Sequence, residues 1–242
     1  QDVAGILIIN PDNPTGAVYP RKVLEQIVSI AKEYNLFLIA DEIYANLTYD
    51  GKFVSLAEVA GEVPTMIMRG LSKEVPWPGS RCGWVEFYNT DKDQDYSEYI
   101  QSIENAKMNE VCSTTLPQSV LPSILSDIRY TQHVADRAQK YQKRARAAAR
   151  ILNKSASLRV VEPKGAFYFT VVFDEGVLTK DQALTISDER VRTLVESLTQ
   201  NEPSLDKRFV YYLLGATGIC VVPLTTGFNS SYYGFRATLL EP

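Results

Sequence analysis

The 242 residues are 45% hydrophobic and 22% charged, and their formal net charge is -4 at pH 7. This is the composition of a globular protein with its own core and room for two domains. The chain has no basic tract typical of nucleic-acid binding and no apolar run as long as a membrane span. We therefore expect neither nucleic acid nor a membrane as a partner.

Cysteine and histidine usage narrows the possible chemistry. Cys82, Cys112 and Cys220 are far apart and odd in number, so they form neither a zinc motif nor a disulfide framework. This usage is typical of a reducing compartment and predicts a cytoplasmic protein. His133 is the only histidine, which disfavours a Ser-His-Asp triad and a histidine-rich metal site. We predict no metal and a surface position for His133.

The first half of the chain alternates between short apolar runs and helical patterns. Residues 3–9 are typical of a strand covered on both faces, and Pro20 opens a helix that reaches about Tyr34. Further strands are expected at 36–40, 66–68 and 81–88, and a helix at 96–108. The order strand–helix–strand predicts parallel pairing and an α/β domain over residues 1–125.

The second half has a different pattern. A long polar helix is expected over residues 126–152, and it predicts a connecting element over 126–153. A smaller α+β domain is expected over residues 154–242, with the following elements: strands at 158–161, 166–173, 219–222 and 235–240, a helix over 188–198 capped by Ser187, and a helical segment at 209–214.

The stretch IINPDNPTGAVYP, residues 8–20, interrupts the first strand–helix unit with turn-forming residues. A plain connector needs about 2–6 residues. This connector is longer, and we interpret it as a segment that holds a functional group in place. Gly16 is expected to adopt a backbone angle that other residues resist.

Reactive side chains follow three of the predicted strands. Asn13 comes after the first strand, Asp41 ends the second with Tyr44 three residues later, and Lys73 follows the third. Arg81 comes eight residues after the lysine. Ligands of an open parallel sheet bind beyond the carboxyl ends of its strands, so we expect these side chains to converge on one edge.

Four motifs carry these residues, in this order: NPDNPTG at 10–16, DEIY at 41–44, LSK at 71–73 followed by PGSRCGW at 78–84, and FR at 235–236. Together they resemble the class I and II aminotransferases across essentially the whole chain. These are pyridoxal-phosphate enzymes of fold type I. The resemblance implies a large domain with a mostly parallel sheet and flanking helices, and a smaller α+β C-terminal domain. It also implies pyridoxal 5'-phosphate as the cofactor, amino acids and 2-oxo acids as substrates, and a homodimer.

The resemblance assigns roles to the residues around the cofactor ring. Lys73 would bind pyridoxal phosphate as an imine and later move the proton at the substrate α-carbon. Asp41 would pair with the pyridine nitrogen and keep it protonated, which makes the ring an electron sink. Tyr44 and Asn13 would donate hydrogen bonds to the phenolic oxygen of the cofactor.

Further residues would bind the anionic groups. Arg81 and Ser72 would hold the phosphate. Arg236 would bind the α-carboxylate of the substrate through its planar fork, and Asn13 would contribute to the same substrate site. Many relatives carry a second phosphate-binding side chain three residues before the lysine, but Gly70 stands there in this chain.

Two other segments bear on specificity. Residues 107–113 resemble the segment from which aspartate-specific members extend an arginine across the dimer, but no arginine stands there. This disfavours an aspartate-type mechanism that uses that residue. Phe167 and Tyr168 lie in a segment that resembles the substrate-facing strand of the small domain, although core packing is the favoured interpretation.

The residues leave several alternatives open. The same scaffold serves lyases and decarboxylases, and it also serves as a ligand-sensing domain in transcription regulators. The family's N-terminal phosphate cradle and closing C-terminal helix have no counterpart in these residues, so we expect a fragment of a longer enzyme. On its own, the chain is predicted to bind pyridoxal phosphate weakly or not at all.

Overall fold

The computed structural model describes residues 3–50 and 52–240. The described residues form two compact units. The first unit comprises 3–12, 17–140 and 164–166, and the second comprises 13–16, 141–163 and 167–240. In the described part of the chain, no helix is both long and apolar enough to cross a membrane.

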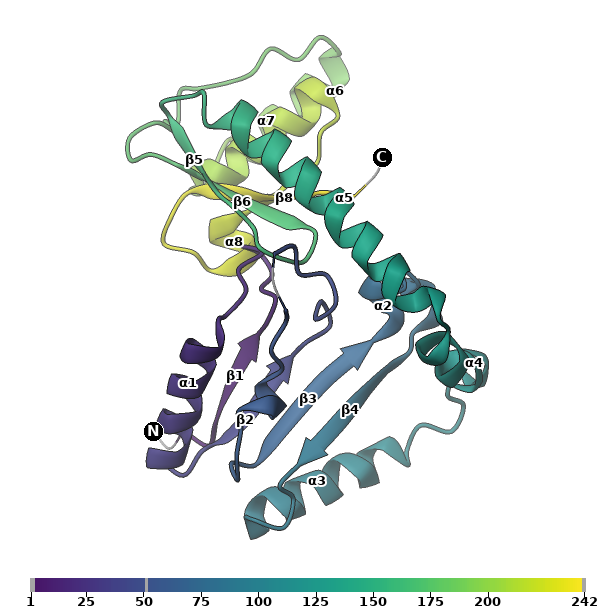
Figure 1. The fold of residues 1–242 in the computed structure, drawn as a ribbon. Helices are drawn as coiled ribbons and strands as arrows, with labels where there is room; N and C mark the ends of the chain where they lie inside the picture. Colours follow the sequence, from purple (N-terminus) through teal and green to yellow (C-terminus); the bar gives the residue numbers. More distant parts are fainter. Residues whose placement is uncertain (1–2, 51, 241–242) are drawn as a thin grey trace. The chain divides into compact units, whose positions relative to one another are not determined.

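The first unit is built on a four-stranded sheet with the order β1-β2-β3-β4 (Figure 1). Its strands are β1 (Gly5–Ile9), β2 (Phe37–Asp41), β3 (Thr65–Gly70) and β4 (Gly83–Tyr88). The first three strands are parallel, and β4 is antiparallel to β3. The register places Asp41 opposite both Ile9 and Met68, so three strands end at the same edge. The mostly parallel α/β sheet expected from the sequence is confirmed.

Helix α1 (Arg21–Glu33) covers one face of this sheet. Pro20 is the residue just before the helix rather than its first residue. The buried core of this face combines α1 residues with strand residues: Ile8, Leu24, Ala31, Leu38, Ala40, Leu56, Val63 and Ile67. Burial of one such large aliphatic side chain contributes about 1.5–3 kcal/mol, so this interface accounts for the position of α1.

The remaining helices of this unit match the sequence in part. The short α2 (Leu71–Glu74) follows β3 directly, and α3 (Gln94–Lys107) packs Tyr96 against Phe37 with ring centroids 5.7 Å apart. Helix α4 (Thr115–Ser126) was not expected, because Pro117 and Pro122 interrupt its sequence.

The long helix α5 (Arg129–Leu152) starts three residues later than expected. Asp127 accounts for this start, because its Oδ1 accepts a hydrogen bond from the Arg129 N–H at 2.8 Å and forms a turn outside the helix. His133 is exposed on α5, as predicted.

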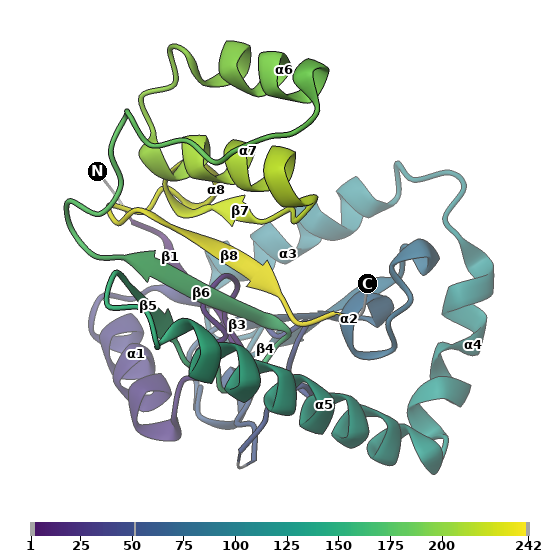
Figure 2. The ribbon, with the colours of Figure 1, turned by 90° about the horizontal axis from the view of Figure 1, so that it is seen from above.

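The second unit contains an antiparallel sheet with the order β5-β6-β8-β7. Its strands are β5 (Leu158–Val161), β6 (Tyr168–Phe173), β7 (Val222–Pro223) and β8 (Gly234–Thr238). Helices α6 (Glu189–Thr199), α7 (Leu205–Thr217) and α8 (Leu224–Phe228) complete it, and Figure 2 shows α7 beside this sheet. The Phe209 ring of α7 lies 4.9 Å from the Phe173 ring and 5.7 Å from the Phe235 ring.

Two details of this unit correct the sequence expectations. The residue that caps α6 is Asp188 rather than Ser187, because the Asp188 Oδ1 accepts from the Arg190 and Val191 N–H groups at 2.9 and 3.0 Å. The strand expected at 219–222 is reduced to the two residues of β7, which pair with β8.

Asp206 is the buried polar centre of the second unit. It is fully buried on α7, and its carboxylate accepts hydrogen bonds from the Ser204 Oγ at 2.6 Å and the Thr225 N–H at 2.9 Å. The Gly234 N–H of β8 also donates to it, at 3.3 Å. One carboxylate therefore joins α7, the first turn of α8 and β8.

Replacement of Asp206 by alanine should destabilise the protein by about 3 kcal/mol, because the donors that it satisfies would be left buried without a partner. Urea unfolding followed by circular dichroism measures this change. Asp181→Ala, an exposed acidic residue of the same unit, is the control. A loss for Asp206→Ala no larger than that of the control would contradict this account.

Glu42, directly after β2, is the buried carboxylate of the first unit and is only 1% exposed. It accepts hydrogen bonds from the Ser55 Oγ at 2.9 Å, the Leu56 N–H at 2.8 Å and the Arg69 Nη2 at 2.7 Å. Burial raises the pKa of Glu42, although the donors at Leu56 and Ser55 and the Arg69 guanidinium lower it. The carboxylate links β2 to β3 and to the turn at 55–58.

A carboxyl whose folded-state pKa is raised stabilises the fold at low pH. This stabilisation is complete below the unfolded-state value of 4.5 and is lost as the pH rises through the folded-state pKa. Glu42→Gln removes this titration. Its free energy of unfolding should therefore rise relative to that of the unchanged protein as the pH increases above 4.5.

Urea titrations at several pH values test this prediction, with the exposed Glu25→Gln on α1 as the control. The prediction is wrong if the difference between Glu42→Gln and the unchanged protein stays constant, or if it shifts in favour of the unchanged protein as the pH rises.

Candidate active site

The first part of the site follows β2. Asp41 is the last residue of this strand and is partly buried, and its Oδ1 accepts a hydrogen bond from the Ile43 N–H at 3.1 Å. The chain then turns, with the Leu47 N–H donating to the Tyr44 carbonyl at 2.8 Å. Tyr44 is 3% exposed. Both predicted residues therefore lie at the carboxyl end of β2.

Lys73 and Ser72 follow the neighbouring strand β3. β3 ends at Gly70 and α2 starts at Leu71, so the lysine is placed just beyond the strand end. The Glu42 N–H donates to the Met68 carbonyl at 3.0 Å, which fixes the ends of β2 and β3 together. Both Ser72 and Lys73 are partly buried.

Neighbouring backbone explains why a glycine stands at position 70. A Cβ at this position would lie 2.9 Å from the Cys82 carbonyl oxygen and 3.0 Å from the Gly83 Cα, both on the chain that enters β4. A larger residue would need this backbone to move. The close approach of β4 therefore accounts for the glycine at this position.

A buried carboxylate next to the lysine fixes this turn. Glu74 is 8% exposed, and it accepts hydrogen bonds from the Asn46 N–H at 2.7 Å and the Asn46 Nδ2 at 2.8 Å. The Tyr130 hydroxyl of α5 donates to the same carboxylate at 2.9 Å. Burial, and then the charge of Glu74, raise the pKa of Tyr130, so this phenol stays a donor. Asn46 follows Tyr44 by two residues, so Glu74 joins the tyrosine turn to the lysine turn.

Arg137 of α5 holds the backbone of the same turn. Its Nη1 donates to the Lys73 carbonyl at 2.7 Å and also to the Glu74 carbonyl. The supporting roles of Glu74, Asn46, Tyr130 and Arg137 are not predicted by the sequence pattern. Only the position of Glu74 beside Lys73 could have indicated a supporting role. The residues that contact this turn lie at least 28 positions away in the sequence.

Arg81 occupies the turn before β4. It has a left-handed backbone with φ +50°, it is exposed, and its Nη1 donates to the Pro78 carbonyl at 3.0 Å. With Nη1 bound to the Pro78 carbonyl, the guanidinium still offers its other N–H groups to an anion.

The second unit brings two predicted residues together. Arg236 of β8 donates from Nη1 to the Asn13 Oδ1 at 3.1 Å. The Arg236 Cζ lies 4.5 Å from the Tyr168 ring centroid and 5.1 Å from that of Phe228. The Arg236 Nε is buried and has no hydrogen-bond partner among the described residues. The guanidinium is thus fixed by aromatic rings and a neutral amide.

The turn that carries Asn13 is fixed on the same unit. The Thr170 Oγ1 of β6 donates to the Pro14 carbonyl at 2.9 Å. Gly16 has a φ of +71°, as the sequence predicts. Phe167 and Tyr168 are each 6% exposed, and Tyr168 packs under Arg236. Their observed contribution is therefore core packing and support of the arginine.

The comparisons with known proteins all indicate the same family. The family described as "Aminotransferase class I and II" matches residues 1–228. An uncharacterized aminotransferase of Methanocaldococcus jannaschii is 49% identical over 240 residues, which are 99% of this chain and 55% of that protein. The glutamate-pyruvate aminotransferase of Escherichia coli strain K12 is 34% identical over 166 residues, which are 68% of this chain and 40% of that protein.

The solved structures agree with this family. The alanine aminotransferase from Pyrococcus furiosus matches with a TM-score of 0.79 and 28% identity, over 98% of this chain and 53% of that one. The chain thus spans about half the length of the relatives that it matches. On these matches, the chain belongs to the class I and II aminotransferases, a family of pyridoxal-phosphate-dependent enzymes of fold type I.

Proposed function

We propose that the whole protein is a pyridoxal-phosphate-dependent aminotransferase that transfers an amino group from an amino acid to a 2-oxo acid. The observation that carries this proposal is the environment of Arg236. It is a partly buried guanidinium whose partners in the described chain are a neutral amide and two aromatic rings, and its Nε has none.

A cation in this environment lacks a counter-ion of its own. Burial of a charge is costly unless an anion pairs with it, and a guanidinium matches a carboxylate through two parallel hydrogen bonds. The planar fork of Arg236 and the amide of Asn13 therefore suit the α-carboxylate that all amino-acid and 2-oxo-acid substrates share. The hydrogen bond between Arg236 and Asn13 fixes the direction in which both side chains present their N–H groups to this carboxylate.

The residues of the first unit fit pyridoxal phosphate in type and position. Lys73 would hold the cofactor covalently, Asp41 would face its ring nitrogen, and Tyr44 would donate to its phenolic oxygen. Asn13, which belongs to the second unit, is proposed as a further donor to that oxygen. Ser72 and Arg81 would hold its phosphate. When bound, pyridoxal phosphate supplies an electron sink that weakens the bonds at the substrate α-carbon.

Residues of the chain would transfer the proton and hold the reacting groups in position. The Lys73 amine would act as the base that takes the proton from the substrate α-carbon and later returns it. The Glu74 and Arg137 contacts fix the backbone from which it acts. The Asp41 carboxyl group would face the ring nitrogen of the cofactor and favour its protonated form.

Further properties of the whole protein are part of this proposal. We propose a homodimer, and we propose the cytoplasm as its compartment, since the described Cys82, Cys112 and Cys220 are all free thiols. We also propose the sequence-based division into a cofactor-binding domain over 1–125, a connecting helix over 126–153 and a small domain over 154–242.

Lys73→Ala should abolish covalent attachment of pyridoxal phosphate, because it removes the amine that lies just beyond the end of β3. Borohydride reduction followed by peptide mass spectrometry detects the attachment site. The 242-residue chain and the whole protein are tested side by side, since the sequence predicts weak binding by the chain alone. Lys92→Ala, a surface lysine of the same unit, is the matched control. Cofactor attached to another lysine in the unchanged protein would refute the assignment.

Arg236→Lys should raise the KM for amino-acid substrates about 10- to 100-fold, because the lysine cannot form the second hydrogen bond to the carboxylate. Steady-state kinetics of the whole protein measure this effect. The same exchange at the exposed Arg159 of β5 serves as the control. Equal KM values for Arg236→Lys and the unchanged protein would exclude Arg236 as the carboxylate-binding residue.

Product analysis separates the proposed activity from the alternatives on the same scaffold. An aminotransferase converts the amino acid to its 2-oxo acid and forms a new amino acid from the acceptor. A decarboxylase releases carbon dioxide and a lyase cleaves the side chain, while a sensing domain forms no product.

A further inference from the structure

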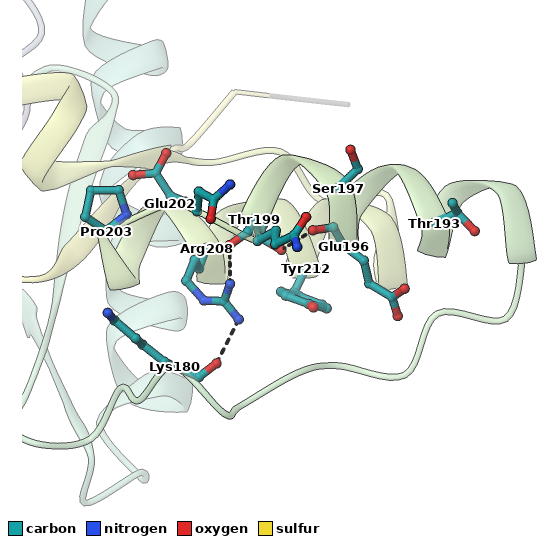
Figure 3. A pocket seen from close by; sticks show the side chains of 11 residues that line it. Lys180, Thr193, Glu196, Ser197, Thr199, Glu202, Pro203, Arg208 and Tyr212 are labelled. Atoms are coloured by element: carbon teal, nitrogen blue, oxygen red, sulfur yellow. Dashed lines mark hydrogen bonds between the residues drawn. The ribbon is translucent and has the colours of Figure 1, made fainter.

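The second unit contains a large hollow that none of the site residues lines. It has a volume of about 810 Å³ and lies between α6, α7 and the segment around Lys180 (Figure 3). Its lining is mostly polar and includes Lys180, Glu196, Ser197, Arg208 and Tyr212.

Arg208 of α7 is the central residue of this hollow. Its Nη1 donates to the Thr199 carbonyl at the end of α6, and its Nη2 donates to the Lys180 carbonyl at 2.8 Å (Figure 3). Its Nε is buried and has no hydrogen-bond partner among the described residues. No carboxylate of the described chain pairs with this guanidinium, so only carbonyl dipoles balance its charge.

A second cation lies at the same end of the hollow. The Lys180 side chain is exposed, and in the described chain its ammonium has no ion-pair or hydrogen-bond partner. Glu202 does not offset these charges, because the Lys207 Nζ lies 2.7 Å from its carboxylate and lowers its pKa. Of the charged side chains that line the hollow, Lys180, Arg208 and Glu196 are therefore left without an ion pair in the described chain. The net charge suits a ligand with one negative charge.

An apolar pocket adjoins the same arginine. It has a volume of about 270 Å³ and shares Arg208 and Tyr212 with the polar hollow. The Arg208 Cζ lies 5.7 Å from the Tyr212 ring centroid, so the cation and the ring form one wall. The remaining lining is largely apolar and includes Leu178, Leu184 and Phe209.

We propose that this part of the second unit is a binding site for a small organic carboxylate with an apolar tail. The carboxylate lies in the polar hollow and pairs with the Lys180 ammonium and with the remaining terminal N–H groups of the Arg208 guanidinium. The tail enters the pocket lined by Leu178, Leu184 and Phe209. This site does not use Arg236 or Asn13, and it holds independently of the proposed activity.

The two carbonyl contacts of Arg208 have a structural role as well. They place a cation at the C-terminus of α6, where it interacts favourably with the helix dipole. This role accounts for the two terminal nitrogens. It does not account for the exposed Lys180 on the same hollow or for the adjoining apolar pocket, and these two features distinguish a ligand site from a helix cap.

Hexanoate is the probe that tests the proposal on the 242-residue chain, with isothermal titration calorimetry as the measurement. We expect saturable binding that weakens about 10-fold in Arg208→Lys, which cannot present the same fork of donors, and about 3-fold in Lys180→Gln. Lys180→Gln leaves the carbonyl that anchors Arg208 in place, so it tests the charge without altering that contact.

Matched probes separate the two halves of the site. Acetate, which lacks the tail, and hexanamide, which lacks the charge, should each bind at least 10-fold more weakly than hexanoate. Arg192→Gln, an exposed arginine of α6, is the control for a general loss of positive charge and should leave hexanoate affinity unchanged.

Arg236→Lys distinguishes this site from the proposed substrate site, and it should also leave hexanoate affinity unchanged. The proposal is overturned by the absence of saturable hexanoate binding, by binding that Arg208→Lys and Lys180→Gln leave intact, or by binding that only Arg236→Lys abolishes. Circular dichroism of each variant excludes unfolding as the cause of a loss.

Discussion

The parallel register of β1, β2 and β3 is the constraint on which the candidate active site depends. Parallel strands in register end at one edge, and here Ile9, Asp41 and Met68 lie side by side at that edge. The chain leaves β2 into the Tyr44 turn and β3 into the Lys73 turn. A shift of β3 by one residue against β2 would reverse the faces on which these side chains lie. The sheet core under α1 favours this register, since it buries Leu38, Ala40 and Ile67 together.

Polar contacts make this edge rigid. Glu42 joins β2 to Arg69 of β3, and Glu74 joins the tyrosine turn to α5. Both carboxylates are nearly inaccessible to solvent. A buried carboxylate that accepts several hydrogen bonds is costly to rearrange, so such groups hold loops in a single conformation. In the second unit, Asp206 has the same effect on α7, α8 and β8. Each unit therefore holds its functional side chains on a framework that buried carboxylates stabilise.

Most of the fold could be predicted from local pattern. The strands, α1, α3 and the capped α6 are visible as periodicity and turn chemistry, and the motif residues indicate where the chemistry lies. Helix α4 was missed because two prolines mask its pattern, and the cap of α6 was placed one residue early. The supporting residues Tyr130 and Arg137 could not be predicted. They lie 56 and 64 positions from Glu74 and Lys73, and no local signal specifies such a pairing. The hollow around Arg208 likewise depends on tertiary packing of α6 and α7, which the sequence does not state.

The most direct test of the account is a crystal structure of the whole protein prepared with pyridoxal phosphate. The account predicts density that joins the cofactor to the Lys73 Nζ, with the Asp41 carboxylate at the pyridine nitrogen and Arg81 at the phosphate. A cofactor bound elsewhere, or an Asp41 carboxylate directed away from the ring, would contradict the claim that the register of β2 and β3 creates the active site.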